Sequence, residues 1–275
     1  MPELPEVETI RMKLRSGSGD VPSIVGQRIK NVSLRWPRHV VKPAVSTFRK
    51  QIRGRAVRDV QRRGKFILIP LDGRTLAIHL MMSGDLRMDD SATPRGRYDH
   101  TVFNFESGWQ LRFSDSRKFG RVFLLKDTEE LLGKLGPEPL ADGFDLPTLV
   151  EILSKRRRAL KPLLLDQTVI AGLGNIYTDE ALHRAKVHPL RQSDSLNSAE
   201  VLALWEGIRG ALQSGLRHNG ASIDWVYRGG EFQNYFRAYG RAGEPCPTCG
   251  SEIVRSVVGQ RGTYFCPTCQ IEEHT

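Results

Sequence analysis

The chain has 275 residues, of which 39% are hydrophobic and 26% charged, and this balance excludes gross disorder. Its 41 Lys and Arg residues outnumber its 31 Asp and Glu residues, and the net charge of +10 favours an anionic partner, nucleic acid first and a membrane surface second. No apolar run approaches the roughly 18–20 residues that span a bilayer, and the acidic, proline-rich N-terminus argues against a cleavable signal. We therefore expect a soluble, intracellular protein.

The order of the sequence patterns predicts a β-rich first half and a helical second half. One helix is predicted over residues 3–15, with Leu4, Val7, Ile10, Met12 and Leu14 on one face. Alternating apolar runs predict short strands over residues 29–34, 65–71, 75–80, 101–105, 110–113 and 122–125, with turns at 72–73, 83–85 and 106–108. Several short strands at this spacing are typical of a β-sandwich or barrel. Residues 136–139 (Gly-Pro-Glu-Pro) indicate a linker. Beyond it, helices are predicted over residues 146–154, 162–166, 175–185, 198–215 and 222–227.

The excess positive charge lies in the first half of the chain. Residues 1–134 hold 26 basic and 15 acidic side chains, a balance of +11, whereas residues 135–275 have a balance of −1. The exception is the basic run 155–158 followed by Lys161, which is either a solvated helix face or a phosphate-binding surface. Because self-repulsion destabilises so basic a half, we expect an anionic partner to bind there.

All four cysteines lie in the turn-rich last segment as two Cys-x2-Cys pairs, Cys246 with Cys249 and Cys266 with Cys269. The 16 residues between the pairs can form a hairpin that brings four thiolates around one tetrahedral Zn²⁺. Four cysteine ligands leave no position for a catalytic water, so we expect a structural site, with disulfides or free thiols as the alternative. Near the middle of the hairpin, Arg261 is either a phosphate contact or an ordinary turn arginine.

The N-terminus carries a second candidate for chemistry. Met1 precedes the small residue Pro2 and is expected to be trimmed, which makes Pro2 the mature terminus. An α-amino group has a pKa of roughly 7.7–8.0, so part of it is unprotonated near neutral pH and can attack a sugar C1′ to form an iminium. Glu3 is a candidate proton donor beside it. On its own, this pattern favours an inert terminus, because most N-terminal Pro-Glu pairs do nothing.

Motifs along the chain resemble those of one known family. They are residues 1–9 (Met-Pro-Glu-Leu-Pro-Glu-Val-Glu-Thr), 62–66, 79–84, 115–120, 135–140, 172–177, 239–241 and the cysteine ribbon with 260–263. In order and spacing, they resemble the bacterial formamidopyrimidine-DNA glycosylases over essentially the whole chain. Leu4 favours this branch over the related endonuclease VIII branch, which typically opens with Pro-Glu-Gly-Pro-Glu.

The resemblance implies an α+β multidomain fold in three parts. These are a catalytic β-sandwich with flanking helices (1–134), a helical helix–two-turn–helix domain (135–240) and a zinc ribbon (241–275), with DNA in the cleft between the sandwich and the helical domain. The resemblance also implies the catalytic roles. Pro2 attacks C1′, Glu3 protonates the sugar, Lys65 contacts phosphates and donates a proton in β-elimination, and Arg261 grips the phosphate beside the lesion and assists δ-elimination.

An enzyme of this family extrudes a base and must fill the gap left in the stack. By resemblance, three side chains fill it: Met82, Arg117 and Phe119, here called the wedge trio. Arg117 is also expected to face the orphaned cytosine; the alternative for Met82 and Phe119 is core packing. The chain departs from the family at Met81, where Gly is usual in His-Leu-Gly-Met-Ser/Thr-Gly, and a bulky residue there could alter the turn.

Further DNA contacts are implied for Asn175, at the start of a helix, and for Arg158 and Lys161 upstream of it. Tyr98 stands where the family often has a His that contacts DNA. His79 and His100 are expected to be structural strand residues. Residues 225–232 occupy the place of the family's lesion-capping loop and are compact here, which leaves the choice among oxidised bases open.

The resulting hypothesis is a bifunctional glycosylase and AP lyase that removes 8-oxoguanine and formamidopyrimidines from duplex DNA by β,δ-elimination. The alternatives are the same chemistry on oxidised pyrimidines, and a non-catalytic protein that binds damaged DNA. The joint presence of Pro2, Glu3, Lys65 and Arg261 favours the enzyme. We expect a zinc-bound monomer in the bacterial cytoplasm, associated with the nucleoid through damaged double-stranded DNA and not with membranes.

Overall fold

The chain, seen in a computed structural model that describes residues 1–223 and 229–272, divides into two compact units. The N-terminal unit comprises Met1–Gly133 and Asn219–Gly230, and the C-terminal unit comprises Lys134–His218 and the chain from Glu231 onward. Most of the helix predicted over residues 222–227, and half of the expected capping loop over 225–232, lie outside the described residues.

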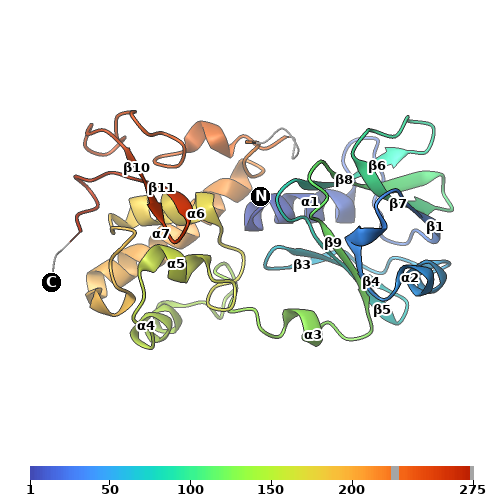
Figure 1. The fold of residues 1–275 in the computed structure, drawn as a ribbon, viewed down its shortest axis with the longest axis horizontal. Helices are drawn as coiled ribbons and strands as arrows, with labels where there is room; N and C mark the ends of the chain where they lie inside the picture. The colour runs from blue at the N-terminus through green and yellow to red at the C-terminus, as the bar shows by residue number, and fades with distance from the viewer. Residues whose placement is uncertain (224–228, 273–275) are drawn as a thin grey trace. The chain divides into compact units, whose positions relative to one another are not determined.

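Two β-sheets form the N-terminal unit (Figure 1). The first has the order β1-β7-β8-β6, formed by β1 (Ile29–Leu34), β7 (Asp99–Phe105), β8 (Trp109–Asp115) and β6 (Gly84–Asp90). The second has the order β2-β9-β5-β4-β3, formed by β2 (Val40–Lys42), β9 (Arg121–Leu125), β5 (Arg74–His79), β4 (Phe66–Leu71) and β3 (Gln61–Arg63). Paired strands are antiparallel except β2 and β9.

The core of this unit draws on both sheets. Phe103 and Phe113 of the first sheet and Ile67 and Ile78 of the second are fully buried in one hydrophobic cluster, as expected when alternate residues of two stacked sheets point inward. Helix α1 (Leu4–Ser16) adds its apolar face to the same cluster. Met12, which the periodicity placed on that face, is 39% exposed.

Several elements of this unit were missed by the sequence patterns. Strand β6 begins where a turn was expected; it buries Leu86 and Met88, and the charged residues between them obscure the alternation. The other unpredicted elements are short: β2, β3, α2 (Val45–Ile52), α3 (Glu129–Leu132) and the 3-10 helix η1 (Pro37–His39).

The C-terminal unit is helical, with α4 (Leu146–Ser154), α5 (Leu160–Leu165), α6 (Asn175–Ala185), α7 (Ser198–Arg217) and the 3-10 helices η2 (Ser193–Ser195) and η3 (Phe232–Tyr235). Helices α4 and α7 begin at side-chain caps, because Asp145 accepts from the amide of Thr148 and Asn197 from that of Glu200. The helices predicted over residues 146–154 and 175–185 have the bounds of α4 and α6, and those predicted over 162–166 and 198–215 correspond to α5 and α7 with shifted ends.

A two-stranded hairpin of β10 (Val254–Val258) and β11 (Arg261–Phe265) completes this unit. It lies beside α6 (Figure 1), where Asp179 accepts a 3.0 Å hydrogen bond from the amide of Tyr264. The expected α+β class, a β-sandwich followed by a helical region and a cysteine ribbon, is therefore confirmed. Across the described residues, we find no helix with the length and apolarity that a bilayer crossing demands.

Candidate functional site

The first turn of α1 positions Pro2 and Glu3, both of which are buried. The carboxylate of Glu6 holds this turn: one oxygen accepts from the Glu3 amide at 2.7 Å, and the other accepts from the Ala221 amide at 2.7 Å. At Gly220, with φ at +78°, an added Cβ would lie 2.6 Å from a Glu6 oxygen. Glu6 therefore joins the helix start to a distant segment of the same unit.

Lys65 follows the tight β3–β4 turn and is 5% exposed. Glycine is suited to the position before it, because Gly64 has φ at +56°. On the preceding strand, Arg62 donates to the Glu8 carboxylate of α1 at 2.9 Å and to the Gly64 carbonyl at 3.0 Å. This ion pair attaches the turn that bears Lys65 to α1, the helix that follows Pro2 and Glu3.

The wedge trio lies on two turns of the sandwich. Met82 is half-buried on the β5–β6 turn, and Arg117 and Phe119 are exposed on the β8–β9 turn. The Phe119 ring is 48% exposed, with the Arg117 guanidinium 5.1 Å from its centroid. Phe119 is thus not a core residue, which excludes core packing for it, and its role in the wedge stays a prediction.

Met81 has a left-handed backbone, with φ at +53°. Its amide donates a 3.0 Å hydrogen bond to Nδ1 of His79, at the end of β5. Burial, together with the charges of Lys65 and Arg121, lowers the pKa of His79 to about 4. The neutral ring can therefore accept this bond at ordinary pH, and His79 supports the turn that precedes Met82.

Tyr98, which stands where the family often has a DNA-contacting His, is 42% exposed at the end of the loop between β6 and β7. The Arg97 guanidinium lies 5.5 Å from its ring centroid. The backbone carbonyl of Tyr98 accepts a 2.9 Å hydrogen bond from the Asp115 amide. The loop therefore presents an aromatic ring and cations on the surface, which suits contact with nucleic acid.

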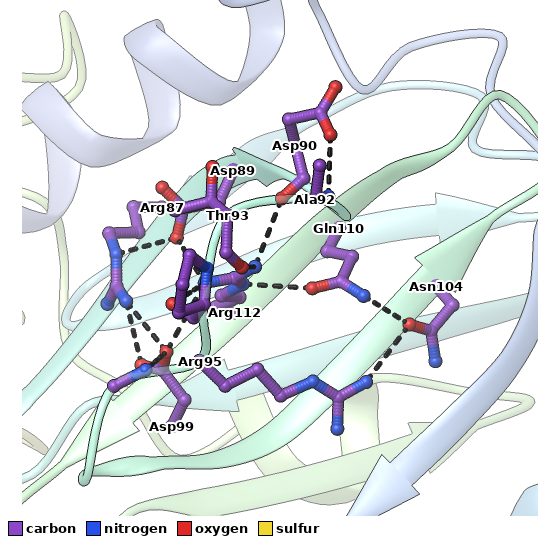
Figure 2. A network of polar contacts seen from close by, with 12 residues as sticks. Arg87, Asp89, Asp90, Ala92, Thr93, Arg95, Asp99, Asn104, Gln110 and Arg112 are labelled. Atoms are coloured by element: carbon purple, nitrogen blue, oxygen red, sulfur yellow. Dashed lines mark hydrogen bonds and ion pairs between the residues drawn. The ribbon is translucent and has the colours of Figure 1, made fainter.

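A buried guanidinium anchors that loop (Figure 2). Arg112 of β8 is fully buried and donates to the carbonyls of Asp90, Thr93 and Pro94 at 3.1, 2.6 and 3.1 Å. Its charge is balanced by the nearby carboxylates of Asp89 and Asp99. Sequence reasoning missed this residue because nothing in an alternating strand marks which arginine is buried.

In the C-terminal unit, the residues expected to contact phosphate differ in their placement. Arg261 is exposed near the ribbon tip, and Arg158 is half-exposed and ion-paired with Asp166 at 2.9 Å. The Asn175 amide, at the start of α6, donates to the Gly262 carbonyl at 2.9 Å. It thereby holds the strand that follows Arg261 against the helix N-terminus.

The expectation that Lys161 contacts phosphate does not fit its placement. Its side chain is fully buried, and its amine donates to Asp179 at 2.6 Å and to the Gly262 carbonyl at 3.0 Å. Burial raises the pKa of Asp179 to about 7, against the opposing effect of the Lys161 charge. Lys161 therefore attaches the ribbon to α5 and α6 from within the unit.

The cysteine ribbon fits a zinc ion. The sulfurs of Cys246, Cys249, Cys266 and Cys269 all lie within 4.8 Å of one another, with one pair at 3.4 Å and another at 4.0 Å. Tetrahedral coordination at 2.3 Å needs sulfur separations of about 3.8 Å. Nε2 of His183 lies 3.3 Å from the Cys246 sulfur and can support this ligand from outside the coordination shell. The ribbon binds one structural Zn²⁺.

The chain thus combines a β-sandwich whose first helix follows Pro2 and Glu3, a helical unit and a four-cysteine zinc ribbon. Residues 1–122 match the formamidopyrimidine-DNA glycosylase N-terminal domain, residues 135–226 its H2TH domain, and residues 243–271 the zinc finger found in FPG and IleRS. The chain belongs to the formamidopyrimidine-DNA glycosylase family, which confirms the resemblance seen in its motifs.

Individual relatives match over almost the full chain. The formamidopyrimidine-DNA glycosylases of Roseiflexus sp. (strain RS-1) and Pelotomaculum thermopropionicum are 47% and 42% identical, over 98% of this chain and 100% and 99% of theirs. Wild-type Lactococcus lactis Fpg (MutM) bound to N7-benzyl-Fapy-dG DNA matches with a TM-score of 0.91 at 38% identity. MutM bound to carbocyclic 8-oxo-G DNA matches with a TM-score of 0.90 at 38% identity. Both structures cover 98% of this chain and are themselves covered completely.

Proposed function

We propose that this chain excises oxidised purines, 8-oxoguanine and formamidopyrimidines, from duplex DNA and then cleaves the strand at the abasic site. The observation that carries the proposal is the buried Pro2–Glu3 pair at the start of α1, fixed by Glu6. Relatives of similar structure bind DNA that contains 8-oxo-G and, in L. lactis Fpg, an abasic site. The substrate class of this chain is proposed from that likeness.

In the proposed mechanism, loss of Met1 exposes the secondary amine of Pro2. The positive end of the α1 dipole disfavours a further proton on this amine and so favours its nucleophilic form. The amine attacks C1′ as the bond to the base breaks, and the base leaves with the proton that the Pro2 nitrogen gives up. Glu3 protonates the ring oxygen, which opens the sugar and leaves an iminium between Pro2 and C1′.

The iminium then acidifies the C2′ proton. Loss of this proton expels the 3′ phosphate in β-elimination, and a second elimination expels the 5′ phosphate; water then hydrolyses the iminium and frees Pro2. We assign phosphate stabilisation to Lys65 in the N-terminal unit and Arg261 in the C-terminal unit. Met82, Arg117 and Phe119 fill the gap that the extruded base leaves.

The remaining DNA contacts are proposed at two exposed side chains and at Asn175, which is half-buried. Tyr98 of the N-terminal unit and Arg158 of the C-terminal unit are placed at the phosphates, with Asn175 at the N-terminus of α6. We place the enzyme in the cytoplasm as a monomer held on the nucleoid by DNA. We also propose that the chain has three functional domains: the catalytic β-sandwich (1–134), the helix–two-turn–helix domain (135–240) and the zinc ribbon (241–275).

Borohydride trapping tests the proposal on duplexes with 8-oxoguanine opposite cytosine. The wild type should form a covalent adduct, and Pro2→Gly should form none because it lacks the secondary amine. Pro5→Gly is the matched control: it makes the same change three residues further along the same helix start and should still form the adduct. Tight binding without an adduct would favour the non-catalytic alternative. Faster trapping on a 5-hydroxycytosine duplex would favour the oxidised-pyrimidine alternative.

A further inference from the structure

Two turns of the sandwich cross from one sheet to the other at the same place. The β5–β6 turn carries Met82, and the β8–β9 turn carries Arg117 and Phe119. Strands β5 and β9 pair in one sheet, with His79 opposite Arg121, whereas β6 and β8 pair in the other, with Gly84 opposite Asp115. Both turns therefore begin and end on paired strands, which places them side by side.

A buried carboxylate links the two turns. Asp115 is fully buried, and one of its oxygens accepts from the Ser83 hydroxyl at 2.5 Å and from the Arg117 amide at 3.2 Å. Its other oxygen accepts from the Gly120 amide at 2.7 Å. The Ser83 oxygen itself accepts from the Arg117 amide at 3.0 Å. Ser83 directly follows Met82, so the hydrogen bonds run from one end of the wedge trio to the other.

Two aromatic rings, of Phe113 and His39, pack beneath the two turns and the Asp115 carboxylate. Phe113 of β8 lies beneath both turns: a Cβ added at Gly84 would lie 2.7 Å from its ring, and one added at Gly120 would lie 2.2 Å from it. The His39 ring lies 4.8 Å from the Phe113 ring, with Nε2 of His39 3.4 Å from the Asp115 carboxylate. The two turns thus rest closely on one rigid surface, with little room for either to shift.

The carboxylate is ionised at ordinary pH. Burial raises its pKa, but the nearby His39 ring and the hydrogen bonds from Ser83 and the Gly120 amide outweigh burial and lower the pKa of Asp115 to about 2. Hydrogen bonds to an ionised acceptor are roughly twice as strong as neutral ones. The link between the turns is therefore a strong one.

We propose that Asp115 and Ser83 act as a positioning pair that fixes the Met82 turn relative to the Arg117–Phe119 turn, so that the wedge trio enters the DNA stack as one rigid unit. This inference rests on the proposed function and deepens it. Neither side chain needs to touch DNA or the reacting sugar. Their contribution is preorganisation, because side chains already held in their inserted arrangement lose less freedom when they insert.

Ser83→Ala tests the pair, because it removes the bridging hydroxyl and leaves the wedge trio intact. We expect single-turnover excision of 8-oxoguanine opposite cytosine to slow on the order of tenfold, the worth of one buried hydrogen bond to a charged group. Discrimination between cytosine and adenine opposite the lesion should fall as well. Borohydride trapping at a preformed abasic site, where no base has to be extruded, should stay within about twofold.

Two further variants separate positioning from stability. Thr101→Val removes a hydroxyl from the same buried network, where it lies 3.0 Å from Nδ1 of His39, but leaves the bonds to both turns. It should lower the melting temperature without changing excision. Ser83→Thr keeps the hydroxyl, and threonine is tolerated here in the family's motif, so it should restore excision. If Ser83→Ala excises like the wild type, or loses excision and trapping in parallel, the proposal is wrong.

A binding readout keeps the test independent of catalysis. The fluorescent base 2-aminopurine, placed beside the lesion in the duplex, reports unstacking by an increase in its fluorescence. This increase should be large when the wild type binds and smaller when Ser83→Ala or Asp115→Asn binds. Equal brightening with the wild type and a folded Asp115→Asn would contradict the positioning pair. Failure of the wild type to form a trapped adduct would instead contradict the proposed function, and the fluorescence comparison would still decide the role of the pair.

Discussion

At the scale of single residues, Met81 has a backbone conformation that is costly for any residue with a Cβ. Its φ of +53° lies in the left-handed region, where the family usually has glycine. We expect Met81→Gly to exceed Met81→Ala in free energy of unfolding by about 1 kcal/mol, because only glycine removes the Cβ clash. Urea denaturation of the two variants measures this difference. Equal stabilities would show that the turn is not strained.

His79, which supports the same turn, gives a prediction about pH. Its folded-state pKa of about 4 lies below the usual histidine pKa of 6.5, so folding favours the neutral ring. The stability that depends on the neutral ring should be lost as the pH falls from about 6.5 towards 4. Nitrogen NMR, assigned with His79→Gln, should show a proton on Nε2 and none on Nδ1 at pH 6. Titration near pH 6.5 would contradict this assignment.

At the scale of elements, the β6–β7 loop depends on one buried side chain. Lysine in place of Arg112 keeps the charge but cannot reach three carbonyls, so Arg112→Lys should lower the free energy of unfolding by about 2–3 kcal/mol. The loosened loop should also be cut faster by trypsin at Arg95 or Arg97. The exposed Arg97→Lys is the control and should match the wild type. If Arg112→Lys has the stability and the trypsin cleavage rate of the wild type, Arg112 does not anchor the β6–β7 loop.

At the scale of the whole molecule, the ribbon depends on its metal whereas the sandwich has its own core. Removal of zinc by a chelator should weaken binding to lesion-containing DNA on the order of tenfold, through misplacement of Arg261. The cooperative unfolding of the sandwich, followed by near-ultraviolet circular dichroism, should remain. Readdition of Zn²⁺ should restore binding. Simultaneous loss of binding and of the sandwich transition would contradict an independent ribbon.

The sequence predicts the periodic and motif-bearing parts of this molecule and misses its buried polar contacts. Strands β1, β4 and β5 are recognisable as short apolar runs bounded by turn formers, and the spacing of the cysteines specifies the ribbon. By contrast, the burial of Lys161 depends on a carbonyl at Gly262, which is 101 residues away in the sequence. Likewise, the pairing of Ser83 with Asp115 depends on the register of two strands. Such contacts follow from tertiary packing, which local patterns do not encode.

The central claim is that the imino nitrogen of Pro2 becomes bonded to deoxyribose. Mass spectrometry of the borohydride-trapped complex, after digestion of protein and DNA, tests this claim most directly. We predict an N-terminal peptide that lacks Met1 and carries the reduced sugar fragment on Pro2. Active protein that retains Met1, or an adduct located on a lysine such as Lys65, would contradict the account.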